Sequence, residues 1–281
     1  MVMSDFKALL SEKFIQIENK LNFRKEVFSS YEEALKECSA LGYKNEDIVK
    51  VVYEKTKRYR DDLTFQKCIN KRKANVEVSL ISLIKNMPDK VQNILDFGGA
   101  CGHHYFIIRD SLDKGYKLNW HVVETKVMCN YGSRLENDEL RFFGDIEEAK
   151  SKMPSIDIIY ASGVIQYVKD PYYFVKFFLG TDAKYILFSR MCFTLSNHDV
   201  IAIQKSMLSW HAKWNGIGKL PEYSKDRVIK CPITLIQKKK FDELVKRKYQ
   251  YEIEFKDDSG VVRVNNEPIV GLDLLCKLKS S

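Results

Sequence analysis

The chain has 281 residues, of which 45% are hydrophobic and 30% are charged, and its formal net charge is +8. This composition excludes general intrinsic disorder, and the length excludes a disulfide-stapled miniprotein. No apolar run reaches the roughly 18 to 20 residues of a membrane span, and the start, MVMSDFKALLSEKF, lacks the uncharged core of a signal peptide. We therefore expect a cytoplasmic α/β protein with a hydrophobic core of its own.

The positive charge is concentrated in residues 205–248, which contain 12 lysines and arginines against four acids. Residues 1–90 contain 18 basic against 14 acidic residues, so they form no strongly basic arm of the kind that binds a nucleic-acid backbone. We expect no nucleic-acid partner. The basic stretch is expected either to form a solvated helix face near residues 238–248 or to bind an anionic substrate.

The cysteines and histidines do not form a recognisable metal site. Seven cysteines are scattered without a CxxC pair, and five histidines include no HExxH pattern. We therefore predict neither a bound metal nor a disulfide framework. The sequence leaves the oligomeric state open.

Residues 1–90 are expected to form an N-terminal helical lead-in. Ser30 precedes an acidic first turn and predicts a helix that ends at Gly42, and Asn45 caps the start of the next helix. A third helix has one apolar face and ends before Pro88; the face consists of Val76, Leu80, Leu83 and Ile84.

From residue 91 onward, short apolar strands alternate with helices, which predicts a mostly parallel sheet covered on both faces. The expected strands are VQNILDF, NWHVVE, RFF, SIDIIYA and AKYILFSR. The helix after the fourth strand is marked by Asp170 as cap, by Pro171 in its first turn and by Gly180 past its end.

Residues 193–232 are expected to form a long irregular insertion, followed by the helix KKKFDELVKRK and by two final strands, YQYEIEF and GLDLLCKL. A turn-rich segment with Asp257, Asp258, Gly260 and Asn265 joins the two strands. A terminal hairpin whose last strand enters a parallel sheet antiparallel is the architecture of class I methyltransferases. The predicted fold is thus a Rossmann-like, seven-stranded α/β sheet, with residues 91–281 as the S-adenosylmethionine-binding domain.

The strongest local signal is ILDFGGACG at residues 94–102, a strand that runs into a glycine-rich turn. Glycine lets a backbone approach a ligand too closely for any Cβ, and ligands of open α/β sheets bind at such strand ends. A P-loop is excluded because no lysine is present, and a dinucleotide GxGxxG would need glycine at Ala100 and His103. The methyltransferase pattern of an acid followed by GxGxG is met, with Ala100 replacing the central glycine; the predicted cofactor residues here are Asp96, Gly98, Gly99 and Gly102.

Three further strand ends carry candidate cofactor residues. Glu124 ends the second strand, where a carboxylate would bind a ribose diol. Asp145 follows the third strand and is expected either to bind the adenine amino group or simply to cap a helix. Gln166 and Tyr167 follow the fourth strand, where this fold lines the sulfonium and methyl groups.

From about residue 30 to the end, the chain resembles a family of bacterial methyltransferases often encoded among surface-polysaccharide genes. The resemblance is carried by ILDFGGACGHHYFIIRD, WHVVE, IIYASGVIQYVKDPYYFV and YILFSRMCFT. It implies a class I fold, S-adenosylmethionine as cofactor and an acceptor connected with capsule or lipopolysaccharide. The family's motif residues fall on Asp96, Gly98, Gly99, Gly102, His104, Tyr105, Glu124, Gln166, Tyr167 and Arg190. Serine is commoner where His103 stands, and Trp210, Trp214 and Pro232 match the family's insertion loosely.

Methyl transfer from a sulfonium is an in-line displacement that depends mainly on alignment. A sugar hydroxyl acceptor needs a general base, for which the candidates are His104, His198 and His211. A phosphate or phosphoramidate oxygen needs only cationic partners such as Arg190, Lys205 and Arg227. The basic charge of residues 205–248 favours an anionic acceptor.

Besides the cofactor residues, the sequence predicts two further sets of site residues. The catalytic set is His104, Tyr167 and Arg190, and the acceptor-binding set, with the insertion as a lid, is Tyr105, Lys205, Trp210, His211, Trp214 and Arg227. The predicted reaction is O-methylation of an anionic, phosphorylated, phosphoramidate or nucleotide-linked precursor of a surface polysaccharide. Two alternatives stay open: a nicotinamide-dependent sugar oxidoreductase, and a catalytically inactive S-adenosylmethionine-binding partner protein, because the central glycine is missing.

Overall fold

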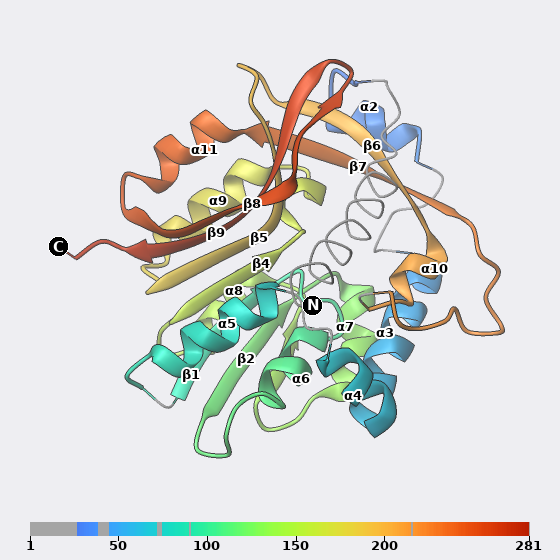
Figure 1. Ribbon diagram of the computed structural model, residues 1–281, viewed down its shortest axis with the longest axis vertical. Helices are drawn as coiled ribbons and strands as arrows, with labels where there is room; N and C mark the ends of the chain where they lie inside the picture. The colour runs from blue at the N-terminus through green and yellow to red at the C-terminus, as the bar shows by residue number, and fades with distance from the viewer. Residues whose placement is uncertain (1–26, 39–44, 72–74, 90, 215, 281) are drawn as a thin grey trace, which may run out of the picture.

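The computed structural model describes residues 27–38, 45–71, 75–89, 91–214 and 216–280. A central sheet crosses the molecule (Figure 1). Its strands are β1 Val91–Phe97, β2 Lys117–Val123, β3 Leu140–Phe143, β4 Ile158–Ser162, β5 Tyr185–Thr194, β6 Val200–Met207, β7 Val228–Gln237, β8 Tyr249–Val264 and β9 Glu267–Leu278.

The strand order confirms the predicted class I methyltransferase fold. Strands β1 to β5 are mutually parallel in the order β3-β2-β1-β4-β5. Strand β9 then pairs antiparallel with both β5 and β8, so the last strand lies between its two neighbours with opposite direction. The hairpin turns at Asn265 and Asn266, both with positive φ, so the turn lies at the end of the predicted turn-rich segment. Strand β8 extends through the rest of that segment, including residues 257–260.

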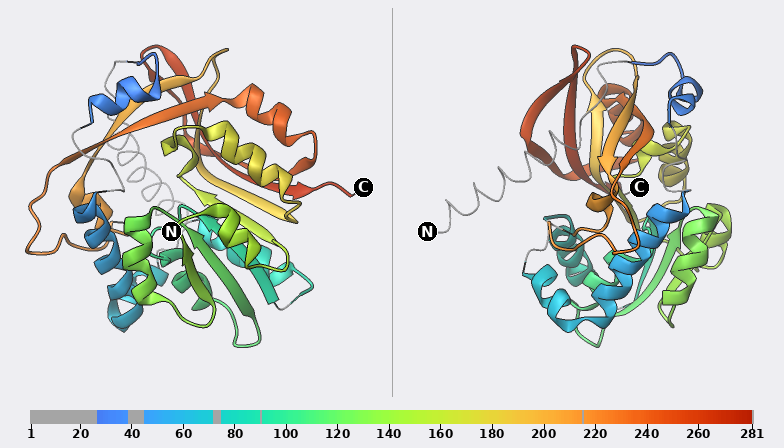
Figure 2. Two further views of the ribbon diagram at one scale, coloured as in Figure 1. Left: turned by 180° about the vertical axis from the view of Figure 1, so that it is seen from behind. Right: turned by 90° about the vertical axis from the view of Figure 1, so that its right-hand side faces the viewer.

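Helices cover both faces of this sheet (Figures 1 and 2). Helices α5 Asn75–Asn86 and α6 His103–Arg109 pack on one face, where Leu80 and Ile84 meet Ile108. Helices α8 Ile146–Ser151, α9 Pro171–Gly180 and α11 Lys238–Val245 pack on the other, around Phe178 and Phe241. The apolar side chains of parallel strands are buried on both sides in this way.

Two N-terminal helices begin at the predicted caps: α2 Tyr31–Lys36 is capped by Ser30 and α3 Glu46–Asp61 by Asn45. A further helix that was not predicted, α4 Leu63–Asn70, is capped by Asp62. The predicted helix end at Gly42 lies outside the described residues. Helix α3 packs on α7 Lys126–Gly132 and on α10 Leu208–His211, so it stands beside the carboxyl end of the sheet. We propose that the N-terminal helical lead-in ends at residue 90 and that the methyltransferase domain begins at residue 91.

The expected irregular insertion at residues 193–232 instead contains strand β6 and the first half of strand β7. Strands β6 and β7 form an antiparallel hairpin from Val200↔Leu235 to Met207↔Val228, and only residues 208–227 lie outside its strands. Pro232 is tolerated because β7 joins β5 only at Ile236 and Gln237, so the other edge of the strand at Pro232 needs no ladder hydrogen bond. The sheet therefore has nine strands where seven were predicted.

Within the described residues, no helix combines the length and the apolar composition that crossing a membrane requires.

Candidate functional site

The glycine turn connects β1 to α6 and is tightly packed. Gly98, Ala100 and Gly102 all have positive φ, of 74°, 51° and 77°. A Cβ on Gly98 would lie 2.4 Å from Val164 Cγ2. Ala100 occupies a left-handed conformation that costs a non-glycine residue roughly 1–2 kcal/mol. Strain of this kind is typical of ligand-binding turns.

Asp96 lies directly beneath the turn and is 1% exposed. A Cβ on Gly99 would lie 2.3 Å from its Oδ2, and Trp120 Nε1 donates to the same oxygen at 3.0 Å. Burial raises the pKa of Asp96 to about 8, the charge of Glu124 adds to this shift, and the Trp120 hydrogen bond opposes it.

Glu124 follows β2 and fastens the turn to the sheet. Its Oε1 accepts from Ala100 N at 3.1 Å and its Oε2 accepts from Thr125 N at 2.8 Å. Burial raises the pKa of Glu124, and these two hydrogen bonds oppose the shift. Within the part of the chain that the structure describes, neither Asp96 nor Glu124 has an ion pair with a lysine or arginine. Two carboxyl groups thus converge on the turn, with no cationic partner in the described ranges.

Arg190 reaches from the end of β5 to the end of β4. It sits at a bulge with φ 53°, and its backbone N–H donates to Asp273 Oδ1 at 2.6 Å. Its Nε donates to Ser162 Oγ at 3.1 Å, and its guanidinium packs over Gly163. Gln166 Nε2 donates to the Arg190 carbonyl at 3.2 Å, whereas Gln166 Oε1 is buried without a partner. The structure thus brings Arg190 and Gln166 together.

His104 is buried behind the turn, beside the neighbouring His103 and three side chains from other parts of the chain. Its Nδ1 lies 3.5 Å from Glu77 Oε1 on α5. Its ring contacts His103, Tyr160 on β4 and Trp214, with ring centroids 4.0, 5.1 and 6.2 Å apart. Burial lowers the pKa of His104, and the carboxylate of Glu77 opposes the shift. A buried imidazole that stays neutral can accept a proton.

Glu77 keeps its charge in this setting. Burial raises its pKa, but the hydrogen bonding of His104 and the positive charge that this ring carries when protonated, with a smaller contribution from Arg190, outweigh burial. The pKa of Glu77 therefore lies below its ordinary value. Neither Glu77 nor Tyr160 was predicted. The available signal was an acid within the apolar face of its helix, three and seven residues before Leu80 and Ile84.

The structure places three predicted site residues elsewhere. Tyr105 packs against Trp120 in the core and its hydroxyl donates to Glu139 Oε2 at 3.0 Å, so it is not an acceptor wall. Tyr167 turns toward the β6–β7 hairpin, where its hydroxyl donates to Gln204 Oε1, and its catalytic role stays a prediction. Asp145 is exposed and caps α8 by accepting from Glu148 N at 2.9 Å, as the helix-cap alternative expected.

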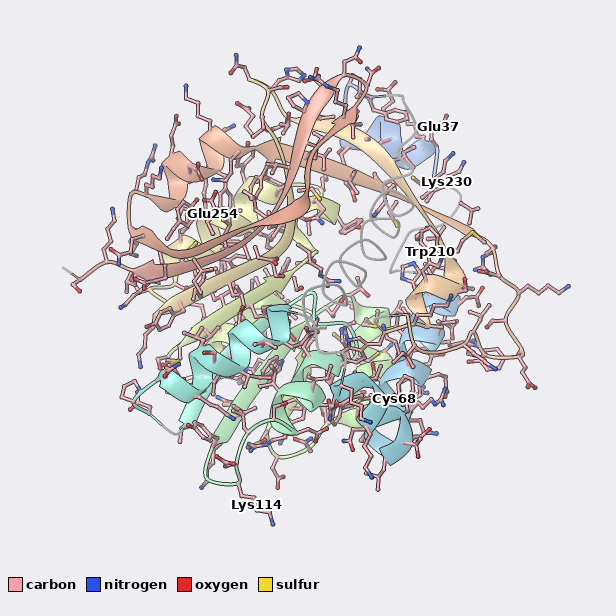
Figure 3. All side chains as sticks on the ribbon, in the orientation of Figure 1. Glu37, Cys68, Lys114, Trp210, Lys230 and Glu254 are labelled. Carbon is pink, nitrogen blue, oxygen red and sulfur yellow. The ribbon has the colours of Figure 1, made fainter. Side chains whose placement is uncertain are left out.

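The residues between β6 and β7 reach the site through one tryptophan. Trp214 is buried, and its ring lies 4.5 Å from that of His103 and 5.5 Å from that of Tyr59. Trp210 lies half-buried on α10 (Figure 3). His211 Nε2 lies 3.0 Å from Ser206 Oγ. Trp214 therefore connects the segment between β6 and β7 to His103 and His104.

One of the predicted anion-binding cations is placed differently from expectation. Arg227 NH2 forms an ion pair with Asp47 Oδ2 on α3 at 2.7 Å, so this charge already has an acidic partner. Lys205 lies opposite Lys230 in the hairpin register. Figure 3 shows Lys230 on the same side of the molecule as Trp210.

Arg227→Gln is expected to change little, because both partners of its ion pair are about half exposed. Surface pairs of this kind contribute about 0–1 kcal/mol. Urea unfolding and ligand calorimetry should therefore give nearly wild-type values. A loss of stability well above this range would show that the pair holds the segment in place.

No protein-family model matches this chain, and no curated protein matches it. Among solved structures, it is similar to an O-methyltransferase from a polyketide-synthase multienzyme of Brevibacillus brevis in complex with S-adenosyl-L-homocysteine, at 11% identity and TM-score 0.48, covering 79% of each chain. It is similar to a S-adenosylmethionine-dependent methyltransferase from Clostridium acetobutylicum at 12% identity and TM-score 0.45, covering 79% of this chain and 94% of that one. A third similar structure is the N-terminal domain of EvdMO1 with SAH bound, at 10% identity and TM-score 0.46, covering 75% and 81%. These similarities carry no inference about what this chain binds.

Proposed function

We propose that the protein is a S-adenosylmethionine-dependent O-methyltransferase. The observation that carries this proposal is the position of the glycine turn, at the carboxyl end of β1, in a sheet whose last strand is inserted antiparallel between β5 and β8. Dinucleotide-binding Rossmann sheets have the parallel order 3-2-1-4-5-6 without such a strand. The topology therefore favours a methyltransferase over the nicotinamide-dependent oxidoreductase.

The side chains at the turn suit this ligand. S-adenosylmethionine carries a cationic sulfonium and a ribose diol, and Asp96 and Glu124 provide carboxyl groups that have no cationic partner among the described residues. Glu124 would hold the ribose hydroxyls, while Gly98 and Gly99 would let the backbone approach the ligand. The bound molecule would supply the methyl group, and this chain's residues would align the acceptor with it.

Glu124→Gln is expected to weaken binding of S-adenosylhomocysteine by about 10- to 150-fold, because the ribose loses a charged acceptor worth about 1.5–3 kcal/mol. Isothermal titration calorimetry measures this directly. Glu139→Gln is the matched control, since Glu139 also accepts a backbone N–H, from Leu118, but at the opposite end of β2. Equal affinity in Glu124→Gln and wild type would refute the ribose assignment, and binding of NADH instead would favour the oxidoreductase.

We propose a precursor of a bacterial surface polysaccharide as the acceptor, on the strength of the sequence resemblance alone. The excess of basic residues in 205–248, including Lys205 opposite Lys230, supports an acceptor that carries negative charge. If so, higher ionic strength should raise the acceptor's KM and leave the affinity for S-adenosylhomocysteine unchanged. Binding of the cofactor without transfer to any acceptor would favour the inactive partner protein.

A further inference from the structure

We propose that Glu77 and His104 form a buried carboxylate–imidazole pair that takes a proton from the acceptor, so that the methylated atom is a hydroxyl oxygen and not a phosphate oxygen. The proposal rests on the proposed methyltransferase function and deepens it. Glu77 comes from α5, in the N-terminal lead-in, and His104 from the helix that follows the glycine turn. The pair therefore couples the N-terminal helices to the cofactor turn.

Buried polar atoms without partners gather around this pair. Among the described residues, seven buried side-chain polar atoms have no hydrogen-bond partner. Three of them are Glu77 Oε2 and one atom each of His103 and Tyr160, whose rings contact His104. A fourth is His104 Nδ1, which faces Glu77 beyond hydrogen-bond length, and a fifth is Gln166 Oε1, beside Arg190. Buried polar groups are nearly always satisfied, so a cluster of unsatisfied ones indicates a place that a polar ligand completes.

The cluster is continuous with the cofactor turn. His104 contacts Tyr160 on β4, and two residues further along that strand Ser162 accepts from Arg190. His103 and His104 follow directly on Gly102, the last residue of the turn. An acceptor that reaches these groups is thus beside the position proposed for the methyl donor.

The geometry suits proton transfer. His104 Nδ1 faces the Glu77 carboxylate at 3.5 Å, longer than a good hydrogen bond, and such contacts commonly shorten when a ligand binds. A carboxylate at Nδ1 favours the tautomer in which Nε2 carries no proton and can act as a base. In the reaction the acceptor oxygen forms a bond to the methyl carbon, its proton moves to His104, and the electron pair of the broken carbon–sulfur bond stays on sulfur. Glu77 then stabilises the imidazolium as a positioning residue.

A phosphate oxygen would make this arrangement unnecessary. It is already anionic, it needs no base, and a buried glutamate beside it would repel it. Arg190 was predicted as a cation that would bind such a phosphate oxygen, but its Nε and one terminal nitrogen are already bonded to Ser162. A hydroxyl group on a sugar suits the cluster, whether or not the same molecule carries a phosphate elsewhere.

The pair is tested first by nuclear magnetic resonance of the histidine rings in the protein saturated with S-adenosylhomocysteine. Only five histidines are present, so single substitutions assign them. Glu77→Gln keeps the side-chain shape and removes the charge, and we expect the pKa of His104 to fall, because Glu77 raises it against burial and the charges of Arg190 and Lys55. His103 and Tyr160 also face His104 and remain in place.

His121 is the internal control, since it is equally buried but places Nδ1 2.9 Å from the Ala149 carbonyl and not near a carboxylate. Its titration should be the same in wild type and Glu77→Gln, and Glu139→Gln should leave both rings unchanged. An identical titration of His104 in wild type and Glu77→Gln would overturn the pair.

The acceptor atom is tested by transfer of labelled methyl groups. The methyl glycosides of glucose, galactose and mannose offer only hydroxyl oxygens, and phenyl phosphate offers only phosphate oxygens. We expect label on a glycoside, a loss of kcat of about 100- to 10,000-fold in His104→Gln and a smaller loss in Glu77→Gln, with unchanged binding of S-adenosylhomocysteine. Transfer to phenyl phosphate, or no transfer to any glycoside, would overturn the hydroxyl assignment. If the wild-type protein does not bind S-adenosylhomocysteine, the proposed function itself would be overturned.

Discussion

Replacing Gly98 with valine is expected to abolish binding of S-adenosylhomocysteine and to destabilise the protein by about 2–5 kcal/mol. The backbone there has φ 74°, which a β-branched residue adopts only with strain of about 1–2 kcal/mol. The added Cβ would also lie 2.4 Å from Val164 Cγ2, and overpacking of this kind costs about 1–3 kcal/mol. The first obstacle to the new side chain is thus Val164 and not the ligand. Displacing either the turn or Val164 disturbs the cofactor site, which calorimetry would report as lost binding.

Gly115→Val is the matched control for this substitution. A Cβ on Gly115 would meet no atom within 4 Å, and the residue has no positive φ, so the change should stay within about 0.5 kcal/mol of wild-type stability. The double variant Gly98→Ala/Val164→Ala removes part of the clash and keeps the backbone strain. Its stability should therefore lie between those of Gly98→Val and Gly115→Val. Wild-type stability and affinity in Gly98→Val would place the cofactor away from this turn.

The parallel half of the fold could be predicted because its signals are local. The five strands from Val91 to Thr194 are apolar runs bounded by turn residues, and Asp170 and Pro171 mark the start of α9 at adjacent positions. The glycine turn is likewise one short contiguous motif. Each of these signals lies within a few residues of the feature that it predicts.

The β6–β7 hairpin could not be recognised in this way. Its strands are separated by 20 residues, and Pro232 in the second strand indicates an interruption unless the partner strand is known. The same limit applies to Glu77, since its contact with His104 joins positions 27 residues apart through the packing of α5 beside α6.

His104 and Tyr105 show why a motif does not assign the direction of each side chain. Adjacent helical residues point about 100° apart, so neighbouring motif residues need not contact the same part of the structure. The helix turns His104 toward Glu77 and Tyr160, and it turns Tyr105 toward Trp120 in the core. Only the packing of α6 on the sheet decides between them.

Asp96→Asn is expected to stabilise the protein in the absence of ligand, by about 3–6 kcal/mol near pH 8 to 9, because a buried carboxylate is replaced by a neutral group. The folded protein raises the pKa of Asp96 from 3.8 to about 8, so the native state holds this proton more tightly than the unfolded chain. In the wild type, the contribution of protonated Asp96 to the free energy of unfolding is fully present below about pH 4 and is lost as the pH rises through 8. Urea unfolding at pH 5, 7 and 9 should show a difference between variant and wild type that grows with pH.

Asp157→Asn is the matched control with the opposite expected sign. Asp157 is also buried, but its oxygens accept from Asn93 N at 2.8 Å and lie 2.9 Å from Lys184 Nζ. Removing its charge leaves the lysine without this partner and should destabilise the protein at every pH tested. If both substitutions destabilise the protein, then Asp96 is structurally satisfied as a carboxylate. If only Asp96→Asn stabilises it and also weakens binding of S-adenosylmethionine, the carboxylate is kept for a cationic ligand at the expense of stability, as is common for functional sites.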